Sequence, residues 1–524
     1  MENCNIKLLD CTLRDGGYIN DWRFGFNNIK EIISSLVRAN VDIVEVGFLR
    51  NVDYDKDVTR WSTVEELKKV LPAKSNKTLF SAMALHNFYN LDNLKDYDGN
   101  NIDIIRVTFH DYDIQEGMLF CQKVKNKGYK VSCNPINIMG YSDVQLLNII
   151  EQVNLIQPWA FSIVDTFGSM NFEDLERIIG IVNHNLNKEI RIGLHLHENM
   201  AQSFSMAQSF LTKHINREII IDGSLMGMGR VPGNLSIELM AHHLNMYYNK
   251  NYDIDYMLDA IEDHIMMIKN KCGWGYTPAY FLSAKYNLHR NYAEYFLEKG
   301  NLTHKDINHL LSRILPDKKT AFDSSYADEL YKDYLNCHID DTNDINQLKN
   351  IFKGRNVLIL APGSTLNSYE DKIAEFINQN HPLTIALNFI PSSKMINADY
   401  AFFTNNKRYD KLVTYDCRLI VTSNLIGGPA DYRIDYNCIA GAFEQGSNNL
   451  ILVLRLLNRM GIKEAYIAGA DGYKAEEDNY YDVAMRNHKK RDDNFNFVMA
   501  STIKAQGVKI NFLTPSMYNI KGKQ

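Results

Sequence analysis

Short runs of apolar, β-branched residues alternate with longer amphipathic stretches from residue 6 to about residue 224. Such alternation is typical of parallel strands joined by crossover helices. The helix-like segments, such as FNNIKEIISSLVRAN and NFEDLERIIGIVNH, place apolar residues three and four positions apart. Eight strand-like runs can be counted: IKLLDCT (6–12), VDIVEVGF (41–48), TLFSAMA (78–84), IDIIRVTF (102–109), KVSCNPIN (130–137), AFSIVDT (160–166), RIGLHLH (191–197) and REIIIDGS (217–224). Eight βα units predict a closed (β/α)8 barrel, whose active site is formed at the carboxyl ends of its strands.

The pattern changes after the eighth run. Residues 253–315 predict helices without strands, and the charged stretch that follows has a weaker pattern. GRNVLILAPGSTL then places a strand, a Pro-Gly-Ser turn and a helix in succession, and LTIALNF, YAFFT, RLIVTS and EAYIAGAD add strand-like runs. We therefore expect a barrel domain over 1–250, a helical extension that completes its site over 251–315, a linker over 316–353 and a second, Rossmann-like α/β domain over 354–524.

Composition narrows the classes of protein. A chain of 524 residues, 45% hydrophobic and 23% charged, is long enough for two or three globular domains. A net charge of −6 gives no general attraction to nucleic acid or to anionic membranes. The amino terminus lacks a secretory signal pattern, and no apolar run is long enough to span a membrane. The eight cysteines show no CxxC pair. These features predict a cytoplasmic protein without nucleic-acid or membrane partners.

Three segments place metal-binding side chains at the functional rim of the predicted barrel. Asp15 follows the first strand in TLRDGG, and His195 and His197 end the seventh in GLHLH. Alternate residues of a strand share a face, so both imidazoles point the same way. Asn234, in the GMGRVPGN loop after the eighth strand, offers an amide oxygen as a fourth ligand. Two histidines and a carboxylate predict a divalent-metal site with open positions.

These segments resemble a known family. LLDCTLRDGGY, GLHLHENMAQS and GMGRVPGN are similar to the signature segments of metal-dependent aldolase and lyase TIM barrels, which include 4-hydroxy-2-oxovalerate aldolase, 3-hydroxy-3-methylglutaryl-CoA lyase and isopropylmalate synthase. The resemblance covers about residues 5–290. It implies a bound Mn2+ or Mg2+, a 2-keto acid and an aldehyde as substrates, and Arg14 as the group that stabilises an enolate. The chemistry agrees, because an enolate oxygen needs preorganised cations. A salt bridge to Glu45 or Asp165 is the competing role for Arg14.

The group that transfers the proton departs from the family pattern. The similar aldolases have a histidine three residues after the metal-binding aspartate, where this chain has Tyr18. Tyr18, His110, Tyr276 and Tyr280 are the candidates for this role, of which Tyr18 and Tyr276 are our choice. Asp165, in VDTFG, matches a segment that lines the family's site, and we expect it to orient ligands or substrate.

Other reactions are open to such a barrel. Acetyl-CoA-dependent Claisen synthases usually carry a glutamine soon after the Arg-Asp-Gly motif, and Gly17, Tyr18 and Ile19 stand there instead. This difference favours an aldolase and leaves the synthase as the alternative. A scaffold barrel joined to a nucleotide-sugar transferase is another alternative. A Schiff-base aldolase is less favoured, because no strand end offers an obvious lysine.

The second domain carries a weaker signal. VLILAPGST predicts a strand, a glycine-containing turn and a helix start, which can meet a phosphate or form a plain turn capped by Ser364 or Thr365. Residues 354–515 faintly resemble Rossmann-like domains of a pterin pyrophosphokinase-type family and of bacterial glycosyltransferases. The resemblance implies a nucleotide or nucleotide-sugar site at Gly363, Ser364 and Asp471. From the fusion we expect biosynthesis of an unusual sugar acid or surface glycan, and we leave open whether the chain forms a homo-oligomer.

Overall fold

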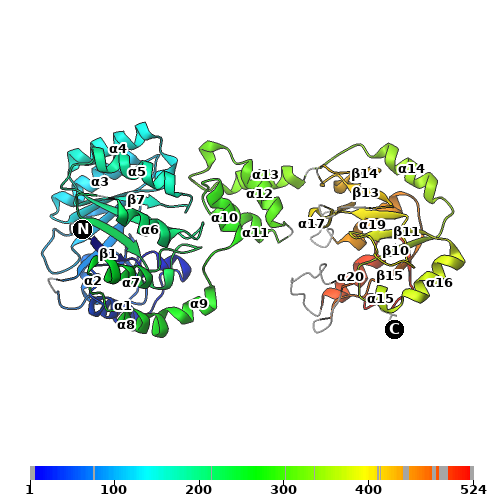
Figure 1. Ribbon diagram of the computed structural model, residues 1–524, viewed down its shortest axis with the longest axis horizontal. Coiled ribbons are helices and arrows are strands. Elements are labelled where there is room, and N and C mark those ends of the chain that lie inside the picture. The colour runs from blue at the N-terminus through cyan, green and yellow to red at the C-terminus, as the bar shows by residue number, and fades with distance from the viewer. Residues whose placement is uncertain are drawn as a thin grey trace. The chain divides into compact units, whose positions relative to one another are not determined.

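The computed structural model describes residues 6–74, 77–213, 215–300, 302–335, 337–409, 412, 415–425, 427–440, 448–474, 480–482 and 494–519. The chain folds into two compact units, Met1–Ala327 and Asp328–Gln524, which are described separately below. Figure 1 labels the elements of both units. None of the helices that the structure describes is long and apolar enough to cross a membrane.

The first unit contains the predicted closed barrel. Its parallel strands follow the order β1-β9-β8-β7-β6-β5-β4-β2, and β1 also pairs with β2, which closes the ring. A short extra strand, β3 (Arg60–Trp61), adds to β2 and was not predicted. The eight barrel strands are β1 (Ile6–Asp10), β2 (Ile43–Leu49), β4 (Leu79–Ala84), β5 (Ile104–Phe109), β6 (Lys130–Pro135), β7 (Ala160–Asp165), β8 (Arg191–Leu196) and β9 (Ile219–Gly223). All eight coincide with the predicted runs, so the fold prediction is confirmed.

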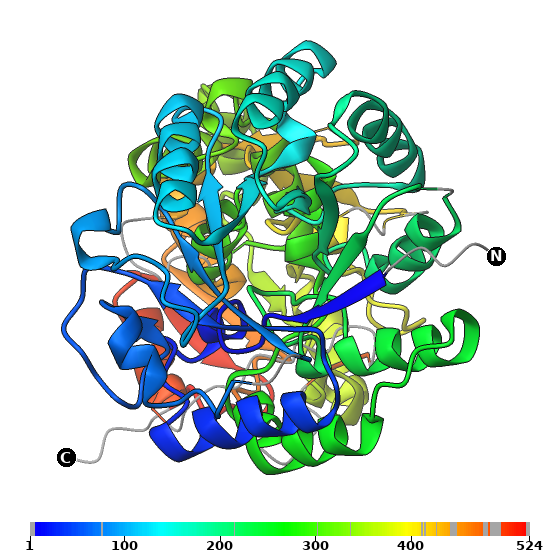
Figure 2. The same cartoon turned by 90° about the vertical axis from the view of Figure 1, so that its left-hand side faces the viewer.

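Helices surround the strands, as Figure 2 shows. They are α1 (Phe26–Arg38), α2 (Val64–Lys68), α3 (Ile114–Asn126), α4 (Asp143–Ile156), α5 (Phe172–Asn185), α6 (Ser203–Thr212), α7 (Ile237–Tyr248) and α8 (Ile254–Ala260). Each longer helix buries an apolar stripe against the strands, as in α1, where Ile29, Ile32, Ile33 and Leu36 are fully buried. This outer layer of apolar contacts is the main core of the unit.

The barrel interior changes from apolar to charged toward the rim. Leu9, Ile43, Ile104 and Ile220 form an apolar layer inside the ring. Two residues further along their strands, on the same face, lie three buried charged groups: Glu45, Arg106 and Asp222. Arg106 contacts both carboxylates although β2, β5 and β9 are not neighbours, so these contacts cross the barrel interior. The strands therefore hold a rigid charged layer directly below the rim.

A helical extension belongs to the same unit and packs on the rim loops. It comprises a π-helical turn (Ile261–Ile265), α9 (Met266–Cys272), α10 (Pro278–Lys285), α11 (Asn291–Glu298) and α12 (His304–Ser312). Trp274 Nε1 donates to Met226 O at 3.0 Å, which ties the segment before α10 to the loop after β9. Asn199 Nδ2 donates to Tyr280 O at 3.1 Å, which ties α10 to the loop after β8. The extension thus covers part of the barrel mouth.

The stretch 316–353 contains two helices, α13 (Ser324–Leu335) and α14 (Thr342–Phe352). The two units divide inside α13, between Ala327 and Asp328. Helix α14 is part of the second unit, where Leu348 and Phe352 are fully buried in its core. Only part of the expected linker therefore lacks regular structure.

The second unit is an α/β fold with a seven-stranded, fully parallel sheet. Its strand order is β14-β13-β12-β11-β10-β15-β16. Val357 and Ile359 of β10 join one apolar cluster and Leu358 and Leu360 another, so both faces of the sheet are covered. The strands are β10 (Val357–Leu360), β11 (Leu383–Leu387), β12 (Tyr400–Phe403), β13 (Arg418–Thr422), β14 (Tyr432–Ile434), β15 (Glu464–Ala468) and β16 (Lys509–Phe512). The helices are α15 (Thr365–Ser368), α16 (Glu370–Asn380), α17 (Asn406–Tyr409), α18 (Tyr436–Ala440), α19 (Asn449–Arg459) and α20 (Phe495–Lys504).

Candidate functional site

The three predicted metal-binding side chains converge at the carboxyl-terminal rim of the barrel. Asp15 lies in the turn after β1, His195 lies in β8, and His197 directly follows β8. The Oδ2 atom of Asp15 is 3.3 Å from His195 Nε2 and 3.6 Å from His197 Nε2. Barrel closure explains this proximity, because β9 pairs with both β1 and β8. All three side chains are buried.

Several candidate ligand atoms in this group have no hydrogen-bond partner among the described residues. Asp15 Oδ2, His197 Nε2 and Asn234 Oδ1 are buried and unpartnered within the described part of the chain. The other end of the Asn234 amide is engaged, because Nδ2 donates to Met228 O at 3.3 Å. Asn234 pairs with His197 in an isolated β-bridge, which keeps the two residues together. Buried polar atoms without partners are costly, so these convergent acceptors fit a bound cation.

Second partners fix the orientation of both imidazoles. His197 Nδ1 is 2.9 Å from the backbone oxygen of Asp165, which can only accept, so the proton lies on Nδ1 and Nε2 keeps its lone pair. His195 Nδ1 is 3.1 Å from Asp222 Oδ2. Both Nε2 atoms consequently face Asp15. Imidazoles that bind metals are commonly held through the other ring nitrogen in this manner.

The protonation equilibria of these ligands follow from their charged neighbours. Burial acts to raise the pKa of Asp15, but the positive charge of Arg14 and the two adjacent imidazoles hold it well below its usual range. Burial acts to lower the pKa of His195, but the neighbouring carboxylates of Asp15 and Asp222 outweigh burial and raise it. Burial chiefly lowers the pKa of His197. Asp15 is therefore ionised and His197 neutral.

A buried network of ion pairs supports the rim. Arg14 Nε donates to Glu45 Oε2 at 2.7 Å, and Arg14 Nη1 is 3.0 Å from Asp15 Oδ1. Arg106 donates to Glu45 Oε2 at 3.0 Å and to Asp222 Oδ2. Three carboxylates thus face two guanidiniums in a region without solvent, and the excess of negative charge favours a divalent cation. The competing salt bridge that we considered for Arg14 is present with Glu45.

Asp165 shapes the site mainly through its backbone. Its carbonyl oxygen accepts the hydrogen bond from His197. Its carboxylate accepts hydrogen bonds from the backbone nitrogens of Ser169, at 2.9 Å, and Met170, at 3.3 Å. Burial raises the pKa of Asp165 to about 7, and the two backbone hydrogen bonds limit the rise. Asp165 therefore positions His197 through its backbone, and its expected role in orienting ligands or substrate stays a prediction.

The candidate residues for proton transfer lie in different surroundings. Tyr18 lies in the 3-10 turn Gly16–Ile19, directly after Asp15, and the guanidinium carbon of Arg230 is 5.8 Å from its ring centre. Tyr276 is 57% exposed, and the Tyr280 hydroxyl donates to a glutamate of α11 at 2.9 Å. His110 has a buried Nδ1 that lacks a hydrogen-bond partner among the described residues. Tyr18 is the candidate that lies beside the metal ligands in sequence and beside a cation in space.

A small cavity adjoins the metal ligands. It is lined by Thr166, Phe167, His197, Asn199, Arg230, Val231, Ser283, Leu288 and Arg290. The sequence prediction did not include Arg230 and Arg290 as site residues, nor Asp222 below them. Asp222 lies near the end of the eighth predicted strand and Arg230 in the GMGRVPGN loop that follows it, which is a usable signal. Arg290 follows the helix α10 and shows no signal in the sequence.

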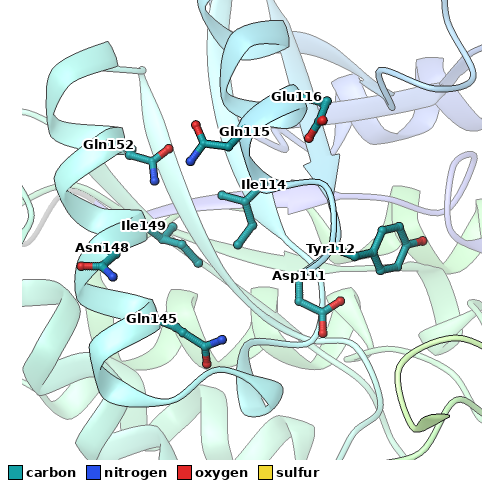
Figure 3. Close-up of a pocket in the computed structure, with 9 residues that line it drawn as sticks. All are labelled: Asp111, Tyr112, Ile114, Gln115, Glu116, Gln145, Asn148, Ile149 and Gln152. Atoms are coloured by element: carbon teal, nitrogen blue, oxygen red, sulfur yellow. The ribbon is translucent and has the colours of Figure 1, made fainter. Parts of the chain in front are cut away.

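A wider groove lies on the outside of the barrel, between the amino-terminal parts of α3 and α4 (Figure 3). Amide side chains, including Gln115, Gln145 and Gln152, line much of it. Neither the metal ligands nor any other predicted site residue lines this groove. We therefore place the chemistry at the rim.

In the second unit, the predicted nucleotide site lies at the point where the strand order reverses, between β10 and β15. Ser364 Oγ and the Thr365 backbone nitrogen donate to Asp471 Oδ2, at 3.0 and 2.9 Å, and Thr365 Oγ1 donates to Asp471 Oδ1. A Cβ atom on Gly363 would lie 2.2 Å from Gly469 O, so this glycine permits close packing. The carboxylate occupies the donors that a phosphate would need. The turn is therefore held by Asp471 and not by a side-chain cap from Ser364, and the nucleotide site stays a prediction.

The fold and the rim define a class: a closed parallel barrel with two histidines, a carboxylate and an amide at its carboxyl-terminal end. Residues 111–266 match the HMGL-like family model. The 4-hydroxy-2-oxovalerate aldolase of Pseudoalteromonas translucida is 24% identical over 271 residues, which cover 50% of this chain and 76% of the relative. An oxaloacetate decarboxylase of Mycobacterium tuberculosis is 21% identical, and the matched residues cover 49% of this chain and 76% of that relative. Residues 111–266 of the first unit are thus similar to the HMGL-like family.

Two solved structures are similar to parts of this chain. The amino-terminal domain of a putative aldolase from Bacteroides vulgatus is 23% identical, with a TM-score of 0.47, covering 56% of this chain and 96% of that one. A variant of Rhizobium etli pyruvate carboxylase is 12% identical with a TM-score of 0.50, covering 67% of this chain and 39% of that one. The second similarity concerns the fold alone.

Proposed function

We propose that the barrel unit is a divalent-metal-dependent carbon–carbon lyase that forms or cleaves a bond through a pyruvate-type enolate. The observation that carries this proposal is the convergence of Asp15 Oδ2, His197 Nε2 and Asn234 Oδ1 around His195 at the rim, all three buried and without hydrogen-bond partners among the described residues. The family match and the aldolase and decarboxylase relatives support the same class of reaction.

Asp15, His195, His197 and Asn234 would hold the metal, for which we propose Mn2+ or Mg2+. A bound divalent cation polarises a substrate carbonyl and stabilises negative charge on its oxygen. Arg14 supplies a second positive charge. Its Nε is fixed by Glu45, and its Nη1 lies against Asp15, so the guanidinium is held rigidly at the rim. A preorganised cation of this kind stabilises an enolate oxygen without reorganising during the reaction.

Tyr18 is our proposal for proton transfer. Cleavage next to a carbonyl requires that the substrate hydroxyl lose its proton, and the reverse reaction returns it. The Tyr18 ring lies edge-on against Trp22 at 4.7 Å and against Phe48 at 6.2 Å, so its direction is fixed. The guanidinium of Arg230 lies beside the Tyr18 ring. Tyr276 is too exposed for this task, so we do not assign it a role in proton transfer.

The proposed substrates and biosynthetic context rest on the presence of a second α/β unit in the same chain. We propose a 2-keto acid and an aldehyde as substrates, and assembly of an unusual sugar acid or surface-glycan component as the context. The aldehyde is open to test by offering the enzyme pyruvate with a series of aldehydes and identifying the products by mass spectrometry. Failure of every hydroxylated aldehyde to react, with reaction of simple aldehydes retained, would contradict the sugar-acid assignment.

The decisive experiment measures enolate formation directly. The full-length protein is incubated with pyruvate in D2O, and loss of the methyl proton signal is followed by NMR with and without Mn2+. Asp15→Asn and His195→Ala should each abolish the metal-dependent exchange, and should weaken Mn2+ binding on the order of 100-fold, because each removes a direct ligand. Two matched controls keep the residue types. Asp42→Asn lies at the opposite end of the barrel, and His184→Ala is exposed on α5. Exchange that persists unchanged without metal would refute the proposal.

A further inference from the structure

The cavity beside His197 has an unusual charge distribution. Two of its nine lining residues, Arg230 and Arg290, are positively charged, and none is a carboxylate. Asn199, Thr166 and Ser283 add polar groups. The loop after β9 contributes Arg230, and the helical extension contributes Arg290 and Ser283, so the cavity exists only where these two parts of the unit meet. Its position next to a metal ligand places it within reach of a substrate bound there.

Two donor atoms of Arg290 have no acceptor among the residues that the structure describes. Its Nε and Nη1 atoms are buried and lack a hydrogen-bond partner in the described residues. The carboxylate oxygen Oε1 of Glu294 is 3.6 Å from Nε, beyond hydrogen-bond distance, and it already accepts from the Tyr280 hydroxyl at 2.9 Å. The side chain of Arg290 is only 19% exposed, so water cannot fully solvate these donors.

Arg290 has Glu294 at ion-pair distance, whereas no acidic group lies at that distance from Arg230 among the residues described. Its Nη2 lies 2.7 Å from His289 Nε2. This partner is neutral, because burial and the charges of the two arginines lower the pKa of His289 to about 3. Burial and the charge of Arg290 lower the pKa of Arg230 itself. Two guanidiniums therefore repel each other in a poorly solvated space, an arrangement that a bound anion would relieve.

We propose that Arg230 and Arg290 bind an anionic group of the substrate, a carboxylate or a phosphate, in the cavity that adjoins His197. Planar guanidinium forks match the paired oxygens of both groups. The inference rests on the proposed lyase function and adds a substrate class: the enzyme prefers a substrate whose anionic group reaches this cavity. That group belongs either to the keto acid or to the aldehyde, and kinetic comparison separates the two.

The first test measures binding without any reaction. Inorganic phosphate is titrated into the metal-free full-length protein by isothermal calorimetry. Arg290→Met should bind phosphate at least tenfold more weakly than the wild type, whereas Arg313→Met, an exposed arginine on the same extension, should bind it equally. If Arg290→Met fails to fold, Arg290→Lys keeps the charge, loses the fork and should show a smaller loss. Absence of phosphate binding in the wild type, or equal binding by the Arg290 variants, would overturn the inference.

The second test identifies the source of the anionic group. The KM for pyruvate is measured in the exchange reaction, and the KM values for glyoxylate, glyceraldehyde 3-phosphate and neutral glyceraldehyde are measured in the condensation. A rise of tenfold or more with Arg290→Met in the pyruvate arm assigns the group to the keto acid, and a rise confined to the anionic aldehydes assigns it to the aldehyde. Equal KM values in every arm would refute the role of Arg290. Absence of metal-dependent exchange in the wild type would instead refute the lyase function, while the phosphate titration still tests the arginine pair.

Discussion

The buried imidazole of His289 should make the stability of the barrel unit depend on pH. His289 Nε2 is held by Arg230 at 2.7 Å, and its ring lies against Phe167 and Phe322, at centroid distances of 6.0 and 6.5 Å. Burial first, and then the charges of Arg230 and Arg290, lower its pKa from 6.5 to about 3. The folded protein therefore keeps this imidazole neutral at pH values where the unfolded chain protonates it.

The sign and size of the effect follow from proton linkage. Above pH 6.5 both states are neutral and His289 contributes no pH dependence. As the pH falls, the unfolded state takes up a proton that the folded state excludes, so the free energy of unfolding decreases until the pH approaches the folded-state value of about 3. Between about pH 7.5 and about pH 5 the loss should be roughly 2 kcal/mol, at 1.36 kcal/mol per unit of pKa difference.

Urea unfolding followed by tryptophan fluorescence measures this loss. All four tryptophans lie between residues 22 and 274, so the signal reports on the barrel unit alone. His289→Gln keeps a neutral hydrogen-bond acceptor and cannot be protonated. The variant should lose roughly 2 kcal/mol less stability than the wild type over the same pH interval, because other titrating groups cancel in the comparison. Parallel pH profiles for the two proteins, in a buffer free of phosphate and carboxylate, would show that His289 is not kept neutral by the fold.

Three further substitutions test the supports of the site and the fold. Asp222→Asn should weaken Mn2+ binding about 10- to 100-fold, because the partner of His195 Nδ1 loses its charge; electron paramagnetic resonance titration should show no such loss for Asp42→Asn. Gly47→Ala should lower the free energy of unfolding in urea by about 3 kcal/mol or more. Gly47 has a φ of +131°, and a backbone oxygen would lie 2.1 Å from the new Cβ. The control Gly180→Ala lies in a helix, and its new Cβ meets nothing within 4 Å, so it should be neutral or stabilising. A larger loss of stability for Gly180→Ala than for Gly47→Ala would contradict this prediction. Ser142→Ala should cost about 1 kcal/mol by removing the cap of α4, and an unchanged urea midpoint would argue against it.

The predicted part of the fold followed from periodicity. Buried parallel strands need continuous apolar runs, so all eight barrel strands were visible in the sequence. The short strands β3, β14 and β16, of two to four residues, were not predicted, because so few residues show no period. The helices inside 316–353 were also not predicted, because their apolar positions are sparse in a charged stretch.

The sequence by itself determined which side chains we propose as metal ligands. The alternation of side chains along a strand directs His195 and His197 to one side, and the polarity of a βα barrel places them on the same rim as Asp15. Only the tertiary structure decided which charged residues contact these side chains. Asp222 contacts His195 although the two residues are 27 positions apart in the sequence. Arg290 lines the cavity from the helical extension, where no sequence motif marks it. Such contacts depend on how distant segments pack, which local pattern does not encode.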